Sequence, residues 1–245
     1  MPARFFVEER LLSGAEFSLP PGPARHVQVL RLQPGAGLTL FDGRGGEFAA
    51  TVLQMGRSEV RVLVGAHDAV DRELACPVTL ALGMPANERM DTMVEKATEL
   101  GVATIAPLVC ERSVLRLQGE RAGKKRAHWR GVAVAACEQS GRTRLPEVSA
   151  VTTLPGWLQA LPPPGIGERW LLSPGAARSL VQRAAQLGSG REGVLVLSGP
   201  EGGLSPAEEA LACRCGFSPV GLGPRVLRAD TAPLAVLACI GLLSP

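Results

Sequence analysis

Short apolar runs separated by turn residues fill the first 72 positions of the chain, a pattern typical of a small β-rich module. We expect strands where these runs fall, at residues 5–7, 37–41, 47–53 and 59–64. The pairs Asp42-Gly43 and Gly45-Gly46 favour tight turns between two of these strands. We also expect a short helix over residues 26–32 and a connector over residues 66–77.

From residue 78 onward the pattern changes to strands that alternate with helices. The expected strands cover residues 78–83, 103–109, 169–172, 193–197 and 217–222. The expected helices cover residues 124–139, 176–187 and 231–243, with one more after Asn87 and another after Ser205. Asn87 is a plausible N-cap and Gly101 a plausible stop for the first of these helices. This alternation predicts an α/β fold with a mostly parallel sheet.

Two of the helices carry further information. Ser205-Pro206-Ala207-Glu208 places a Ser cap, a Pro in the first turn and a Glu three residues after the cap, which is a strong helix start. The segment 231–243 is apolar on nearly all faces. Such a helix is buried, either in the core or in a dimer interface.

Composition excludes several classes of protein. The chain has 245 residues, of which 46% are hydrophobic and 20% charged, as in a globular protein rather than a disordered one. The longest apolar run, residues 232–243, is shorter than the ~18–20 residues that a membrane-spanning helix needs. The first ten residues carry charge where a signal peptide would be apolar. We therefore expect a cytoplasmic protein.

The cysteines give no sign of a metal site or of disulfides. The chain has six cysteines without a CxxC pair, and only three histidines. We expect buried reduced thiols and no metal ligand. The one close pair is Cys213-x-Cys215.

Positive charge is concentrated in one segment. Residues 112–144 contain nine Lys and Arg against two Glu, a net charge of +7, whereas the whole chain carries only +3. A segment of this kind is a candidate surface for phosphate contacts. A solvated helix face would have the same composition.

Two glycine-rich loops follow predicted strands. The first is Ser198-Gly199-Pro200-Glu201-Gly202-Gly203, and the second runs over residues 221–232 and contains two arginines. Ligands of open α/β sheets bind at the carboxyl ends of strands, so two such loops at adjacent strand ends would form one cleft. Neither loop is a P-loop or a GxGxxG fingerprint, which argues against a nucleotide-dependent oxidoreductase. An ordinary turn and a surface connector are the alternatives.

A third motif, Cys137-Glu138-Gln139-Ser140-Gly141-Arg142, closes the basic helix. It places a carboxylate, an amide and a guanidinium within five residues. The chemistry of a helix C-terminus would explain the same residues.

The order of several motifs resembles the RsmE family of SPOUT-superfamily methyltransferases. These motifs are ARFFV, HVQVLRLQPG, LFDGRGGEF, MVEKATELGV, ACEQSGR, GPEGGLSPAE and LGPRVLRADTA, and together they extend over essentially the whole chain. The resemblance implies a PUA-like β-barrel RNA-binding domain at residues 1–72 and a methyltransferase domain with a C-terminal trefoil knot at residues 73–245. It also implies a homodimer that methylates N3 of a uridine in small-subunit (16S) ribosomal RNA, using S-adenosylmethionine.

Matching the family's motifs residue by residue assigns the site. The cofactor contacts are Leu172, Ser173, Ser198, Gly199, Pro200, Glu201, Gly202, Gly203, Leu222, Gly223, Leu227 and Arg228. The candidates for catalysis are Arg228 and Arg142, to stabilise a uridine anion, and Glu138 and Glu201, to handle or orient the proton. The expected RNA contacts are Arg4, His26, Arg31, Arg112, Lys124 and Lys125. His26 could equally be a buried structural histidine.

The chain departs from the family's pattern at two places. Pro85-Ala86-Asn87 stands where the family usually has Pro-Lys-Gly, and Ala229-Asp230 stands where it usually has Thr-Glu. Two other functions stay open on the sequence. One is a SPOUT methyltransferase acting on another RNA such as transfer RNA, and the other is a non-enzymatic binding factor for ribosomal RNA.

Overall fold

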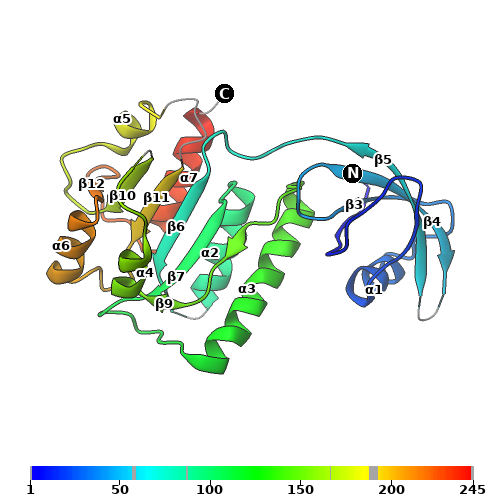
Figure 1. Ribbon diagram of the computed structural model, residues 1–245, viewed down its shortest axis with the longest axis horizontal. Coiled ribbons are helices and arrows are strands. Elements are labelled where there is room, and N and C mark those ends of the chain that lie inside the picture. The colour runs from blue at the N-terminus through cyan, green and yellow to red at the C-terminus, as the bar shows by residue number, and fades with distance from the viewer. Residues whose placement is uncertain (1, 57–58, 87, 166, 188–192, 244–245) are drawn as a thin grey trace. The chain divides into compact units, whose positions relative to one another are not determined.

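The computed structural model describes residues 2–56, 59–86, 88–165, 167–187 and 193–243, and it divides into two compact units (Figure 1). Unit 1 combines Met1–Arg72 with Cys137–Leu145. Unit 2 combines Glu73–Ala136 with Pro146–Pro245.

Unit 1 is built on a five-stranded sheet with the order β1-β3-β4-β5-β2. Its elements are β1 (Arg4–Phe6), β2 (Glu16–Ser18), α1 (Pro21–Val29), β3 (Gly37–Phe41), β4 (Glu47–Met55) and β5 (Val60–Asp68). Strand β1 pairs in parallel with β3, and the other pairs are antiparallel. Burial alternates along β4, where Phe48, Ala50 and Val52 face the core. The β-rich character that the alternation predicts is confirmed.

Helix α1 lies several residues before the expected segment 26–32. Pro21 fits the first turn of a helix because a proline there loses no hydrogen bond that the helix would make. The helix ends at Val29, and Arg31 follows with a φ of 54°, in the left-handed region. Both ends are therefore set by backbone chemistry that apolar spacing does not reveal.

The segment Cys137–Leu145 belongs to unit 1 through backbone pairing. The backbone nitrogen of Leu145 donates to the carbonyl of Gly43 at 3.3 Å, and that of Gly45 donates to the carbonyl of Thr143 at 3.2 Å. An antiparallel bridge joins Arg44 to Arg144. These bonds attach the segment to the turn between β3 and β4.

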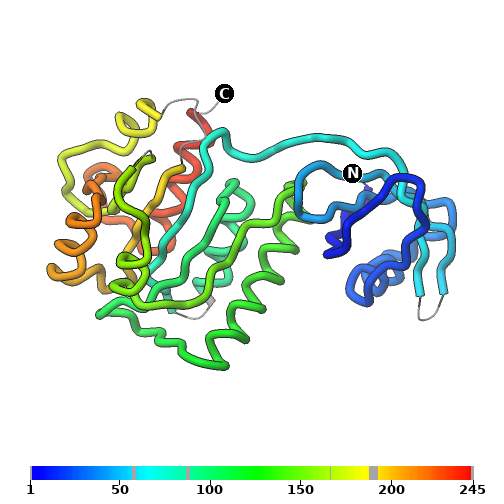
Figure 2. The backbone as a smooth tube through the Cα atoms, in the orientation of Figure 1, coloured from blue at the N-terminus to red at the C-terminus, as the bar shows by residue number. Residues whose placement is uncertain are grey.

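Unit 2 contains a seven-stranded sheet in which every pair is parallel. The order is β12-β10-β11-β6-β7-β8, and β9 also pairs with β7. Its strands are β6 (Val78–Gly83), β7 (Thr104–Val109), β8 (Glu147–Val148), β9 (Thr152–Thr153), β10 (Glu168–Leu172), β11 (Val194–Ser198) and β12 (Ser218–Val220). The mostly parallel α/β sheet is confirmed. Because the strands are parallel, the loops after β10, β11 and β12 leave the same edge of the sheet (Figure 2).

Six helices accompany this sheet in the described residues. They are α2 (Glu88–Glu99), α3 (Gly119–Ser140), α4 (Leu154–Ala160), α5 (Leu180–Ala184), α6 (Pro206–Arg214) and α7 (Thr231–Leu243). The predicted cap is present on α6, where Ser205 and Glu208 form a reciprocal capping box. The predicted cap at Asn87 lies outside the described residues.

Three helices of unit 2 differ from expectation. Helix α3 begins at Gly119, before the expected start at residue 124. The helix expected over residues 176–187 is shorter in the structure, where α5 covers only Leu180–Ala184. Ser179 pairs with Gly221 in a β-bridge and is not part of the helix. Helix α4 was not expected, although Thr153 caps it by accepting a hydrogen bond from the backbone nitrogen of Gly156.

Helix α7 has the predicted bounds but is not buried all round. One face, formed by Ala232, Pro233, Val236, Leu237 and Ile240, packs in the core of unit 2. Leu242 is 87% exposed. No described helix is long and apolar enough to cross a membrane.

The structure places none of the six cysteines in a disulfide. The expectation that they are buried is right for Cys76, Cys110 and Cys137 and wrong for Cys213, which is exposed on α6. Cys215 and Cys239 are half-buried.

Candidate functional site

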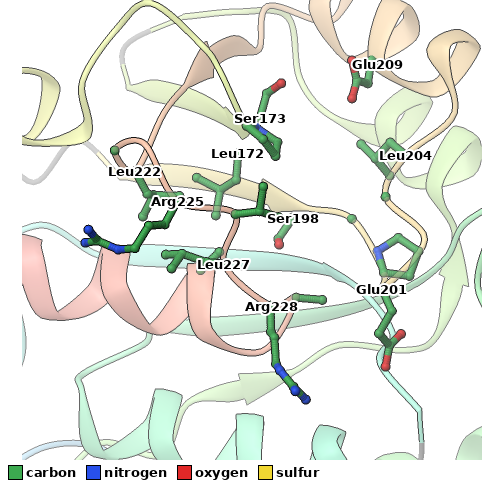
Figure 3. A pocket seen from close by; sticks show the side chains of 18 of the residues that line it. Leu172, Ser173, Ser198, Glu201, Leu204, Glu209, Leu222, Arg225, Leu227 and Arg228 are labelled. Carbon is green, nitrogen blue, oxygen red and sulfur yellow. The ribbon is translucent and has the colours of Figure 1, made fainter.

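A pocket of about 440 Å³ opens at the carboxyl edge of the unit 2 sheet (Figure 3). It is lined by residues that follow β10, β11 and β12, with one residue each from α2, α6 and α7. The lining consists of Arg89, Leu172, Ser173, Pro174, Ser198, Gly199, Pro200, Glu201, Gly203, Leu204, Glu209, Leu222, Gly223, Arg225, Val226, Leu227, Arg228, Ala229 and Ala232. All of these described residues belong to unit 2. The two glycine-rich loops thus form one cleft, as their positions after adjacent strands predict.

Close backbone approach shapes this pocket. A Cβ on Gly83, the last residue of β6, would lie 2.5 Å from the backbone nitrogen of Pro200, so only glycine lets that loop pass. Gly203 and Gly223 have positive φ angles of 69° and 98°, and a Cβ on either would meet nothing within 4 Å. These two lining residues leave open space where other residues would project a side chain.

Glu201 connects the two loops that follow β6 and β11. Its Oε1 atom accepts a hydrogen bond of 3.0 Å from the backbone nitrogen of Ala86 and lies 3.6 Å from an Nη atom of Arg89. The carboxylate is 30% exposed. Glu201 therefore links the two loops at the rim of the pocket, and its negative charge lies next to the positive charge of Arg89.

Two arginines of the rim have no ion-pair partner among the described residues. Arg225 and Arg228 are both exposed, and in Figure 3 their side chains extend in different directions, away from Leu172 and Ser198. Val226 between them is 80% exposed. The rim thus presents two available cations beside a partly apolar cavity, which suits an anionic or electron-rich ligand.

The pocket includes most of the predicted cofactor contacts. Eleven of the twelve line it, and the exception is Gly202, whose carbonyl accepts a hydrogen bond from Arg112. Sequence reasoning missed Arg89, Pro174, Leu204, Glu209, Arg225, Val226, Ala229 and Ala232. Arg225, Val226 and Ala229 lie inside the second glycine-rich loop, residues 221–232. Arg89 lines the pocket because the fold brings α2 next to it, and no local sequence pattern around Arg89 indicates this position.

Of the catalytic candidates, Arg228 and Glu201 line the pocket, whereas Glu138 and Arg142 belong to unit 1. Glu138 accepts a hydrogen bond of 3.0 Å from the backbone nitrogen of Phe6. Arg142 is 3% exposed. Its carbonyl accepts a hydrogen bond of 3.3 Å from Arg4.

Arg4 is at the centre of a buried network in unit 1. It pairs with Glu47 and donates to the carbonyl of Gly141 at 3.1 Å. Arg72 contacts the same two groups, at 3.1 Å and 2.8 Å. The Arg4 side chain is 9% exposed, so it holds the segment 137–145 in place and offers little surface to a ligand.

Two carboxyl groups of unit 1 have pKa values displaced in opposite directions. Burial raises the pKa of Glu138, and it outweighs the hydrogen bond from Phe6. Burial also disfavours the charge on Glu47, but the hydrogen bonds from Arg4 and Arg72 outweigh it and lower the pKa of that carboxyl. The surroundings of the two carboxyl groups thus shift their pKa values in opposite directions.

The other expected RNA contacts differ in their surroundings. His26 is exposed and meets the Phe5 ring edge-on at 5.3 Å, which argues against a buried structural role. Arg31 is exposed. On α3, Lys124 is 76% exposed and pairs with Glu120, whereas the neighbouring Lys125 is half-buried. Arg112 is exposed, but its guanidinium donates to two backbone carbonyls beside the pocket.

Comparison with known families covers both units. A family model for an RNA methyltransferase domain matches residues 72–241. A model for an RNA methyltransferase PUA domain matches residues 24–64.

Curated and solved relatives match nearly the whole chain. The ribosomal RNA small subunit methyltransferase E of Synechocystis is 33% identical over 99% of this chain and 78% of its own length. The protein of the same name from Bacillus subtilis is 32% identical over 97% of this chain and 95% of its own. A crystal structure of ribosomal RNA small subunit methyltransferase E from Neisseria gonorrhoeae, bound to S-adenosyl methionine, is 34% identical with a TM-score of 0.89, covering 99% of this chain and 98% of that one.

The resemblance that the motifs indicate is therefore confirmed at the level of the family. One model matches well over half of the chain, and full-length relatives exceed 30% identity. The chain belongs to the RNA methyltransferase family, among the ribosomal RNA small subunit methyltransferases E.

Proposed function

We propose that the protein uses S-adenosylmethionine to methylate N3 of a specific uridine in small-subunit (16S) ribosomal RNA. The observation that carries this proposal is the pocket at the ends of β10, β11 and β12, where two arginines without an ion-pair partner in the described part of the chain stand beside a partly apolar cavity. The family supports the reaction class, and the cofactor is the molecule bound in the relative from Neisseria gonorrhoeae.

The lining residues fit this cofactor. Leu172, Leu222 and Leu227 offer apolar surface for an aromatic base, and the backbone around Gly203 and Gly223 leaves room for polar groups to meet main-chain atoms. Glu209 adds a carboxylate to the lining. When bound, S-adenosylmethionine supplies the methyl group from a positively charged sulfonium. The chain has to bind it, exclude water and orient the acceptor.

The acceptor sets a second requirement. N3 of uridine lies between two carbonyl groups and is protonated at neutral pH, so a cation beside the oxygens would favour the reactive anion. Arg228 is the favoured candidate, because it lines the pocket and has no ion-pair partner among the described residues. Arg142, Glu138 and Glu201 stay candidates for stabilising the anion or for moving the proton.

RNA would reach the site as an unstacked nucleotide, since N3 lies on the Watson–Crick edge of the base. We propose that residues 1–72 act as a PUA-like RNA-binding domain and residues 73–245 as the methyltransferase domain. The trefoil knot stays a prediction for that second domain. His26, Arg31 and Lys124 are exposed cationic or polar side chains that suit contacts with RNA.

We further propose a cytoplasmic homodimer that forms through α7. That helix buries one face in its own unit and leaves Leu242 exposed. Leu234, Ala235, Ala238 and Cys239 are only half-buried. A second copy would cover this apolar surface.

Methyl transfer tests the function directly. The protein would be incubated with methyl-labelled S-adenosylmethionine and small ribosomal subunits from cells that lack the modification, or with their free 16S RNA. Nucleosides would then be analysed by mass spectrometry. We expect labelled N3-methyluridine in the 16S RNA. Label in transfer RNA alone would favour another RNA substrate, and cofactor-independent RNA binding without label would favour a binding factor.

A further inference from the structure

We propose that Arg112 is a positioning residue that holds the loop 199–204 in the shape that binds cofactor, and not a contact for RNA phosphate. This inference rests on the proposed function, because it assigns a role within the same pocket. Arg112 lies after β7, outside the pocket lining, and its guanidinium donates to backbone carbonyls of the loop.

One guanidinium nitrogen makes both bonds that matter here. Nη1 of Arg112 donates to the carbonyl of Gly202 at 3.1 Å and to the carbonyl of Leu204 at 3.3 Å. These two acceptors lie on either side of Gly203, whose positive φ of 69° forms the bend of the loop. Gly203 and Leu204 line the pocket. The bonds therefore hold the residues on both sides of a bend whose central residue lines the cavity.

Close packing supports the same contact. A Cβ on Gly202 would lie 3.2 Å from Cβ of Arg112, closer than most side-chain contacts, so the loop and the arginine fit together tightly. A side chain at residue 202, which does not line the pocket, would therefore require Arg112 or the loop to shift by a few tenths of an ångström.

A buried carboxylate joins the same two segments a second time. Glu208, which is 7% exposed, accepts a hydrogen bond of 2.8 Å from the backbone nitrogen of Glu111 and another of 2.9 Å from that of Ser205. The turn that carries Arg112 is thus attached to the start of α6, directly after the loop. The backbone from which the Arg112 side chain extends is therefore held next to the loop whose carbonyls it binds.

Two substitutions separate positioning from phosphate binding. Arg112→Lys keeps the positive charge but loses the planar guanidinium, and Arg112→Gln keeps one donor group but loses the charge. If Arg112 positions the loop, both variants weaken binding of S-adenosylmethionine by about 10-fold. Both would bind ribosomal RNA, measured without cofactor, as tightly as the wild type and with the same salt dependence.

The opposite pattern would overturn the proposal. A phosphate contact predicts that Arg112→Lys behaves as the wild type, while Arg112→Gln loses affinity for RNA and reduces its salt dependence. Unchanged cofactor affinity in both variants also contradicts positioning.

Two matched controls and one further measurement complete the design. Arg116→Gln removes a guanidinium that donates to the carbonyl of Glu111 in the same turn, and it should leave cofactor affinity unchanged. Arg121→Gln removes an exposed charge from α3 and should lower only the affinity for RNA. Hydrogen exchange of the backbone amides of residues 201–204 in the free protein should be faster in both Arg112 variants. Unchanged exchange in the variants would contradict the positioning role of Arg112, whether or not the wild type binds cofactor. Absence of cofactor binding in the wild type would instead refute the proposed function.

Discussion

Oε1 of Glu201 accepts a 3.0 Å hydrogen bond from the backbone nitrogen of Ala86, and this bond joins the loops after two paired strands, β11 and β6. The family usually has Lys in place of Ala86. The contact uses the backbone of residue 86, so this departure leaves the link between the loops intact.

Glu201 substitutions distinguish holding the rim from handling a proton. Glu201→Gln keeps an oxygen that can accept from Ala86 and loses only the ion pair with Arg89, so we expect cofactor affinity to change by less than about 3-fold. Glu201→Ala removes both contacts and should weaken cofactor binding by about 10-fold. Calorimetry and steady-state kinetics measure the two effects. Normal cofactor binding with lost turnover in Glu201→Gln would instead assign the proton to this carboxylate.

Gly83→Ala should disturb the packing of β6 against the loop that lines the pocket. The new Cβ would lie 2.5 Å from the nitrogen of Pro200, so either β6 or the loop has to shift. We expect a loss of about 1–3 kcal/mol in the free energy of unfolding and weaker cofactor binding. Gly131→Ala is the matched control, since a Cβ there meets nothing within 4 Å on α3, and it should stabilise the protein by about 0.5–1 kcal/mol. Denaturant unfolding checks both, and a neutral Gly83→Ala would contradict this packing.

Arg228→Ala should separate catalysis from cofactor binding. Removing a cation beside a developing anion costs about 100-fold in turnover. The substitution keeps the backbone of residue 228, through which we expect this position to contact the cofactor, so cofactor binding should change little. Arg225→Ala removes the same charge from the same rim and should mainly raise the KM for RNA. Equal turnover in the wild type and in Arg228→Ala would exclude Arg228 as the anion-stabilising group.

Glu138→Gln should change how the free energy of unfolding depends on pH, because Glu138 carries a partly buried charge when it is ionised. Burial raises the pKa of Glu138 above its ordinary value of 4.5, so the contribution of this group to stability is complete below about pH 4.5 and is lost as the pH rises through the raised pKa. Gln does not titrate and can still accept from Phe6. The variant should therefore match the wild type near pH 4 and exceed its stability at pH 7. Urea unfolding across this range checks the sign, and a gap that shrinks with rising pH would contradict the assignment.

Much of unit 2 could be predicted because its signals are local. The apolar positions of α2 recur at helical spacing, and Met90, Met93 and Val94 are buried as that spacing requires. The cap of α6 uses Ser205 and Glu208, three residues apart, and needs no knowledge of the rest of the fold. The loops of the pocket follow strands that the apolar pattern had located.

The remainder depends on contacts between distant residues. The motif at residues 137–142 joins unit 1 because Arg4 and Arg72 donate to the carbonyl of Gly141, more than 60 positions away in the chain. Arg112 belongs to a basic segment by sequence and supports a loop about 90 positions later. Charge patterning alone does not distinguish an arginine that binds backbone carbonyls from one that is available to bind a phosphate.

Titration calorimetry of the purified protein measures whether the pocket of unit 2 binds S-adenosylmethionine. We predict saturable binding with about one site per chain. The titration would be repeated with small-subunit ribosomal RNA present, because RNA could complete the site. Absence of binding in both titrations would show that the pocket is not a site for this cofactor.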